Sequence, residues 1–172
     1  MTYTLENLAK DCNQALKDDP GPAGREKMAR HLETALKEPE FVAAHFPLEN
    51  DVERQVIYDD PDFGFCILAH VYEGAKASNP HDHADSWAIY GQAQGVTEMT
   101  DWRKVKVPSG DEPGVVEADV VYDLKPGMAR YYDVGFLHSP RREATTRLIR
   151  IEGKNLAGVK RDKYVVVVAA TA

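Results

Sequence analysis

The sequence is short of cysteine, with only Cys12 and Cys66 among its 172 residues. Two cysteines are too few for a disulfide framework. Both lie among apolar neighbours, where a free cysteine usually packs as a small hydrophobic side chain. We therefore expect no disulfide scaffold and no direct chemistry at either thiol.

Positive charge is also scarce, because 21 Lys and Arg stand against 28 Asp and Glu, for a net charge of -7. No cluster of basic residues offsets this balance, so we expect binding neither to nucleic acid nor to an anionic membrane surface. The longest apolar stretch, residues 164–170, is far shorter than a membrane span, and the first residues lack the basic and apolar regions of a signal peptide. These features predict a cytoplasmic protein.

Apolar residues recur at helical spacing in the first 47 residues. From Leu5 the pattern runs to residues 19–22, where two prolines and a glycine prevent a helix from continuing. A second helix is expected from just after Pro22 to Pro39, followed by a short piece over residues 41–46. The sequence therefore predicts a helical segment over residues 1–47.

Short runs of β-branched and aromatic residues, separated by turn residues, make up the rest of the chain. No segment of helical length lies between them, so we expect a mainly antiparallel sandwich or barrel. A chain of this length fits one structural domain, with residues 1–47 packed on a β-barrel formed by residues 48–172. The expected strands cover residues 55–58, 65–72, 86–90, 95–107, 115–122, 128–132, 145–151 and 164–168.

The strongest candidate for chemistry is the run His81-Asp82-His83. On a strand, residues i and i+2 project from the same face, so both imidazoles can reach one cation while Asp82 faces away. Two histidines that only make hydrogen bonds in a loop after Asn79-Pro80 explain this run equally well, because two ligands do not define a metal site.

The segment from His81 to Gly95 reads H-x-H-x4-A-x6-G. It resembles the first motif of the cupin superfamily, in which Glu usually holds the position of Ala88. The final glycine of that motif opens the turn between two strands, a role that Gly95 can fill.

A second segment, Gly127-x5-Asp133-x-Gly135-x2-His138, resembles the second cupin motif, with Asp133 in place of the usual Pro and Arg142 in place of the terminal Asn. The 31 residues 96 to 126 between the two motifs are in keeping with the family. The resemblance implies the mainly β cupin fold, a double-stranded β-helix or jelly-roll-like barrel, with the N-terminal α-helices outside it.

The same resemblance implies that His81, His83 and His138 bind one divalent transition metal. Three neutral imidazoles leave the remaining positions of a first-row metal open to water, a chelating substrate and dioxygen. A closed structural site ordinarily needs a fourth protein ligand, so an open catalytic site is favoured. Fe(II) is the favoured ion, with Zn, Ni, Mn or Cu as alternatives whose occupancy depends on supply.

Within the cupins, residues 65–105 resemble the cysteine dioxygenase-like branch, above all in NPHDHADSW at 79–87 and GVTEMTDW at 95–102. That family binds a small thiol on a three-His ferrous centre and inserts both atoms of dioxygen, which gives a sulfinate. The resemblance implies an iron-dependent dioxygenase with a small-molecule substrate and dioxygen as partners. It places the catalytic arginine that binds the substrate carboxylate at Arg54, whose alternative role is a solvated charge beside Glu53.

Two features of this branch are missing. The cysteine that mammalian-type enzymes cross-link to a tyrosine is Ala88 here, and the Ser, His, Tyr relay falls on Leu148, Arg150 and Glu152. We expect the two charged residues to face water while the isoleucines between them face the core; a polar pair inside the cavity is the alternative.

Other functions fit the same motifs. A three-His cupin that oxidises a carbon substrate such as a β-diketone does not need the relay. A non-catalytic cupin would bind a metal-chelated ligand and act through an oligomer interface, and many cupins pair through their sheets, which implies a homodimer. A zinc hydrolase or isomerase would need Glu152 as an inward-pointing base.

Four further polar residues are weaker candidates. Tyr90 and His70 lie where they can line the barrel, although His70 is expected to be a hydrogen-bonded core histidine. Arg141 and Arg142 follow His138 closely, and either an anionic substrate or a solvated turn explains them.

Overall fold

Three helices begin the computed structural model, which describes residues 2–167. Thr4 caps the first helix, because its hydroxyl accepts from the Asn7 backbone N–H at 3.2 Å while the Asn7 side chain accepts from the Thr4 backbone. No helix within residues 2–167 is long and apolar enough to cross a membrane. The expected helices are confirmed as α1 (Leu5–Asp18), α2 (Pro22–Leu36) and α3 (Pro39–His45).

Ten strands follow in the described part of the chain, and they include all eight that the sequence predicts. Val168, at the end of the last expected strand, lies outside the described residues. Two strands, β3 and β8, were not expected. The strands are β1 (Gln55–Asp59), β2 (Cys66–Tyr72), β3 (Lys76–Ala77), β4 (Ala88–Gln94), β5 (Thr97–Lys106), β6 (Gly114–Leu124), β7 (Ala129–Tyr132), β8 (His138–Arg142), β9 (Thr146–Glu152) and β10 (Tyr164–Val166).

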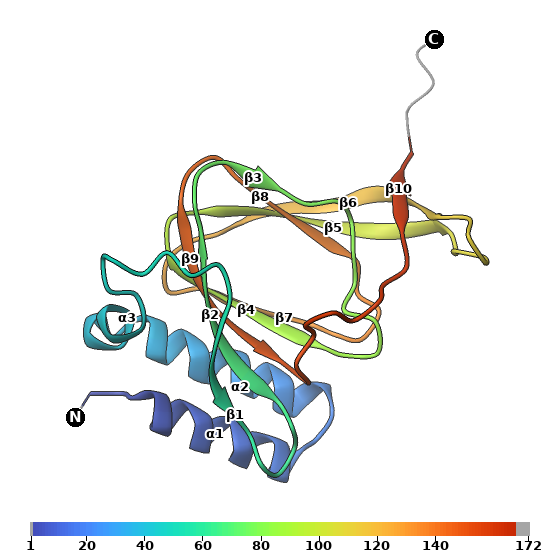
Figure 1. The fold of residues 1–172 in the computed structure, drawn as a ribbon. Coiled ribbons are helices and arrows are strands. Elements are labelled where there is room, and N and C mark those ends of the chain that lie inside the picture. The colour runs from blue at the N-terminus through green and yellow to red at the C-terminus, as the bar shows by residue number, and fades with distance from the viewer. Residues whose placement is uncertain (1, 168–172) are drawn as a thin grey trace.

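The strands form two five-stranded sheets that face each other (Figure 1). One has the order β1-β2-β9-β4-β7 and the other β10-β6-β5-β8-β3, and every pairing is antiparallel except β10 with β6. From β2 onward, each strand lies in the other sheet from the one before it, with the β5–β6 hairpin as the exception. This double winding is the cupin double-stranded β-helix, so the predicted fold class is confirmed.

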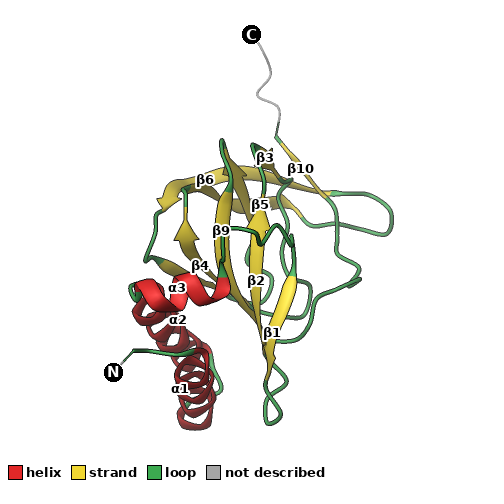
Figure 2. Ribbon diagram, turned by 60° about the vertical axis from the view of Figure 1, so that its left-hand side comes forward, coloured by secondary structure: helices red, strands yellow, loops and turns green. Residues whose placement is uncertain are grey.

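The helices cover the outer face of the first sheet (Figures 1 and 2). The apolar core between them includes Leu32 of α2 together with Ile89 and Ile151 of the sheet, all fully buried. Gly91 of β4 allows this close packing, because a Cβ there would come within 2.6 Å of a Leu32 methyl and 2.7 Å of a Leu36 methyl. Full burial of each such aliphatic side chain contributes roughly 1.5–3 kcal/mol.

The inner face of the same sheet carries buried polar and charged side chains. Along β9, Arg150 and Glu152 alternate with the isoleucines that pack on the helices, and their side chains are only 14% and 1% exposed. The expectation that both face water is therefore wrong, and the alternative, a polar pair inside the barrel, is correct. The physical reason is that the helices cover one face of this sheet and the second sheet lies opposite the other face, so the charged face of β9 is enclosed (Figure 1).

Candidate metal centre

The structure brings the three predicted histidines together inside the barrel. His81 and His138 pair as an antiparallel bridge, with two backbone N–H···O bonds of 3.0 Å, so their side chains are neighbours. One ligating atom from each of His81, His83 and His138 can be chosen so that all lie within 4.8 Å of one another. Atoms at this separation can share a single ion.

His83 lies in a turn rather than on a regular strand. The backbone N–H of Ser86 donates to the His83 carbonyl at 3.0 Å, and Ala84 takes a left-handed backbone conformation with φ 55°. The Asp82 side chain points away from the histidines, as expected. Its carboxylate accepts hydrogen bonds from the Ala84 N–H and from the Tyr164 hydroxyl. The turn thus aims His83 at the bridged pair from a separate direction.

Backbone carbonyls orient two of the imidazoles. His81 Nδ1 lies 2.9 Å from the Asn79 carbonyl, and His138 Nδ1 lies 3.2 Å from that of Phe136. A carbonyl only accepts, so each Nδ1 carries the hydrogen and each Nε2 carries a lone pair that can accept or bind a cation. This is the arrangement by which proteins fix a metal-ligating tautomer.

Tyr90 of β4 completes the cluster. Its hydroxyl oxygen lies 2.9 Å from His83 Nε2 and 3.2 Å from His138 Nε2. His83 Nδ1 is buried without a hydrogen-bond partner in the described part of the chain. From the sequence, Tyr90 is expected only to line the barrel. The available signal for a closer role is its place two residues after Ala88, on the same face of the strand.

Burial keeps the three imidazoles neutral. It lowers the pKa of His81 to about 4, against the effect of the Asn79 carbonyl. Burial, and then the neighbouring histidines, hold the pKa values of His83 and His138 well below their usual range. Since the neutral form is the one that binds metal, the donor set fits a divalent transition metal at neutral pH.

Arg54 lies apart from this cluster. Its Nη2 donates to Glu152 Oε2 at 3.1 Å and to Asn155 Oδ1 at 2.7 Å, with the side chain 31% exposed. Glu152 also accepts from Arg150 at 3.5 Å and from the Leu156 backbone N–H at 3.1 Å. The predicted catalytic arginine therefore neutralises a buried carboxylate.

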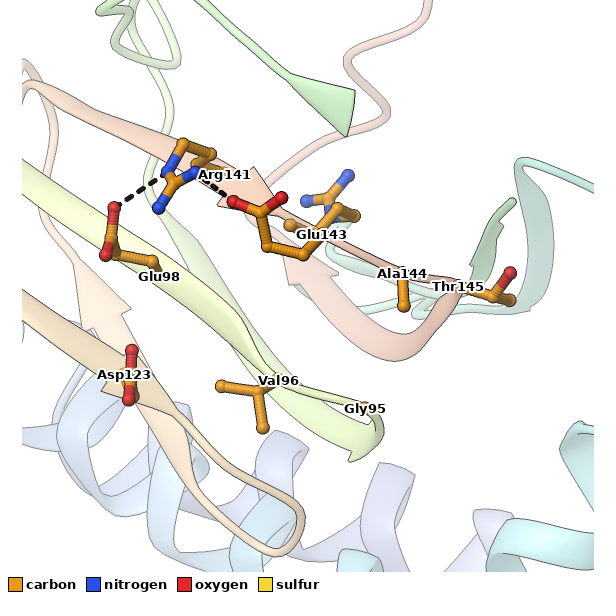
Figure 3. Close-up of a pocket in the computed structure, with 9 residues that line it drawn as sticks. Gly95, Val96, Glu98, Asp123, Arg141, Glu143, Ala144 and Thr145 are labelled. Carbon is orange, nitrogen blue, oxygen red and sulfur yellow. Dashed lines mark hydrogen bonds and ion pairs between the residues drawn. The ribbon is translucent and has the colours of Figure 1, made fainter. Parts of the chain in front are cut away.

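A cavity of about 230 Å³ borders the cluster at His81, and Tyr72, Arg142 and Arg150 also line it. A larger hollow of about 370 Å³ lies over the turn from β8 to β9 and is shown in Figure 3. The larger hollow has no histidine in its lining. Of these two hollows, the smaller one borders the histidine cluster, at His81.

Solved structures with a similar backbone include cupins. A cupin-2 domain containing protein from Shewanella frigidimarina is 19% identical over 63% of this chain and 87% of that chain, with a TM-score of 0.46. KdgF from Halomonas sp. is 16% identical over 58% and 74%, with a TM-score of 0.42. A cupin superfamily protein from Desulfitobacterium hafniense is 14% identical over 60% and 77%, with a TM-score of 0.43. No family profile and no curated protein sequence matches the chain.

Proposed function

We propose that the protein is a metal-dependent cupin enzyme, a mononuclear non-haem iron dioxygenase that acts on a small chelating substrate such as a thiol. The observation that carries this proposal is the cluster of three neutral histidines, two of them fully buried, beside a small cavity. The group of possible ligands within residues 2–167 contains no carboxylate and no cysteine, so protein atoms leave several positions of an ion free. Open positions are typical of catalytic sites.

His81, His83 and His138 would hold the ion, with Fe(II) favoured. A ferrous ion supplies a centre at which a chelating substrate and dioxygen meet, and its chemistry adds oxygen to the substrate. The protein holds the ligands in place: the Tyr132 ring stacks on His138 with centroids 4.1 Å apart, and backbone carbonyls fix the imidazole planes. Such supporting contacts keep the ligands in place before the metal arrives.

Tyr90 is the group that holds a proton at this site. The three positions of the family's relay carry Leu148, Arg150 and Glu152, whereas the Tyr90 hydroxyl reaches the histidines from β4. The Arg150 guanidinium lies over the Tyr90 ring at 4.2 Å, which fixes the ring and favours hydrogen bonding from its oxygen to an anionic ligand. We expect Tyr90→Phe to retain metal and lose most of the turnover.

The first experiment is anaerobic reconstitution with Fe(II), followed by metal analysis and dioxygen uptake with cysteine and 3-mercaptopropionate. We expect His81→Ala and His138→Ala to lose most of the metal while the barrel stays folded. His31→Ala is the control, because His31 lies on α2 outside the cluster. Full metal occupancy in either cluster variant would overturn the site, and no uptake by a fully loaded protein with any substrate would overturn the oxygenase.

A β-diketone dioxygenase is the second candidate, favoured by the loss of the relay, and the same assay with diketones tests it. Uptake with diketones alone would replace the thiol as substrate class. The zinc hydrolase receives less support, because the carboxylate oxygens of its required base, Glu152, already accept hydrogen bonds from Arg54, Arg150 and the Leu156 backbone.

A further inference from the structure

Two arginines from strands that are consecutive in the sequence line the cavity beside His81. Arg142 ends β8 and Arg150 lies in β9. Tyr72 lies between them, with the Arg142 guanidinium 4.2 Å from the centre of its ring and Arg150 Nη2 3.4 Å from its hydroxyl oxygen. Arg142 also borders the larger hollow, but the contact of its guanidinium with Tyr72, which lines the smaller cavity, places that guanidinium beside the smaller cavity.

Positive charge exceeds negative charge in this interior. Arg142 is 6% exposed, forms no ion pair within residues 2–167, and has a buried Nε without a hydrogen-bond partner there. Arg150 shares the single carboxylate of Glu152 with Arg54. Burial lowers the pKa of Arg142, and the charge of Arg150 acts in the same direction. A buried charge without a counter-ion is costly, so an anion that enters the cavity is stabilised.

The preceding residue of β8 has the opposite surroundings. Arg141 points to the outer surface, where it pairs with both Glu98 and Glu143 (Figure 3). Of two adjacent arginines, the exposed one has two carboxylate partners and the buried one has none in the described chain. A shortage of acidic residues near β8 therefore does not explain why Arg142 has no ion-pair partner there.

The remaining charges around the cavity cancel. Lys76 and Glu53 both line it, and they pair with each other at 2.6 Å. The cavity volume of about 230 Å³ is below the range of pockets that hold drug-sized ligands, so it fits a small metabolite.

We propose that Arg142 and Arg150 form an anion-binding subsite that takes the carboxylate, or an equivalent anionic group, of the substrate. The other end of such a molecule would carry the donor that reaches the histidine cluster, and in this respect alone the inference rests on the proposed function. Arginine's planar fork suits a carboxylate, and hydrogen bonds between two charged groups are the stronger kind.

Calorimetric titration of metal-free and zinc-loaded protein tests the subsite. The probes are 3-mercaptopropionate, its uncharged amide and inorganic phosphate. We expect Arg142→Gln to weaken 3-mercaptopropionate binding about tenfold or more, and the matched variant Arg141→Gln to leave it unchanged. The amide should bind equally to wild type and Arg142→Gln. Equal 3-mercaptopropionate affinity in the wild type and Arg142→Gln would overturn the proposal.

Phosphate identifies the source of the anion. Arg142-dependent binding of phosphate in preference to the thiol carboxylate would support the subsite and assign it to a phosphorylated ligand. The metal-free protein reports on the arginines alone, so loss of metal binding and loss of the subsite are separate results. Arg142-dependent binding without any metal uptake would keep the subsite and overturn the proposed enzyme.

Thermal unfolding separates a binding role from a structural one. If the role of Arg142 is to bind an anion, the ligand-free Arg142→Met variant should unfold at a higher temperature than the ligand-free wild type. The substitution removes a buried charge that has no counter-ion. Added 3-mercaptopropionate should raise the unfolding temperature of wild type and not that of the variant. A variant that melts lower and still responds to the ligand would show that Arg142 only supports the fold.

Discussion

The two faces of the helix-covered sheet differ in what they contribute. The outward residues of β2, β4 and β9, such as Ile67, Ile89 and Ile151, pack on the helices in an apolar layer. The inward residues of the same strands include Tyr90 and Arg150, which lie in the barrel with the histidines. Because successive residues of a strand point to opposite sides, stability and chemistry occupy alternate positions of one sequence.

This separation explains how the barrel tolerates its polar interior. Buried polar and charged groups must be paired or they reduce stability, and hydrophobic burial is the main favourable term in folding. The layer between the sheet and the helices supplies that term outside the site. The following changes, in order of expected size, test whether the two faces are independent.

Removing the carboxylate that pairs the interior arginines should have the largest effect. Glu152→Gln keeps the shape of the side chain but leaves Arg150 buried without an ion pair, and we expect a loss of about 4 kcal/mol in the free energy of unfolding. Urea denaturation of the metal-free protein measures it. Glu143→Gln, which alters an exposed carboxylate, is the control and should leave the midpoint unchanged. A loss below about 1 kcal/mol would mean that another group compensates Arg150.

Opening a cavity in the apolar layer should follow in size. Leu32→Ala removes a fully buried side chain between α2 and β4, so we expect unfolding to become easier by about 3 kcal/mol. Metal uptake per folded molecule should stay at the wild-type level. Leu48→Ala is the matched control, because Leu48 is 90% exposed. Reduced metal uptake by folded Leu32→Ala would show that the two faces are coupled.

The turn that carries the chain from β4 to β5 connects the two sheets. Gly95 has φ +72°, and a Cβ there would come within 2.8 Å of the Thr145 carbonyl oxygen. We expect Gly95→Ala to lower the free energy of unfolding by about 2 kcal/mol through backbone strain and this contact. Chemical denaturation checks the value. Gly110→Ala is the comparison, since φ is also positive there but no atom lies within 4 Å of the added Cβ.

Acid should lower the free energy of unfolding, in part through the buried side chain of His70. Burial, followed by the charge of Arg150, lowers the pKa of His70 to about 2, and Tyr72, Arg54 and Arg142 are its other polar or charged neighbours. Below the ordinary histidine pKa of about 6.5, the unfolded chain gains a proton that the folded chain does not, so stability falls as the pH falls. We expect His70→Gln to remove about 1.4 kcal/mol of this loss per pH unit.

Denaturation at pH 8, where the histidine is neutral in both states, gives the reference for each protein, and a series down to pH 4.5 gives the slope. Identical slopes in the wild type and His70→Gln would contradict the assignment.

The sequence was sufficient for the elements whose signals are local. Prolines and a glycine mark the ends of the helices, and the two motif segments contain the histidines that the structure brings together. The strand β8 was not expected because Pro140 and two arginines stand within its five residues, and proline is normally a sign against a central strand.

The parts that could not be predicted depend on contacts between distant segments. Alternation on β9 shows two faces, but only the helices on one side of its sheet and the second sheet on the other reveal that the charged face lies inside a barrel and not in water. Arg54 fits the carboxylate role by its place in the sequence, yet Glu152 lies 98 residues away and binds it. Long-range pairing of this kind cannot be predicted from the local sequence around either residue.

Gly91 has a consequence for the precision of the site. Its missing side chain lets α2 lie directly against β4, and the residue before it is Tyr90, whose hydroxyl lies between two histidines. A larger residue at this position would force the strand away from the helix and move that hydroxyl with it. The distance between α2 and β4 therefore sets the position of the Tyr90 hydroxyl on the opposite side of the sheet.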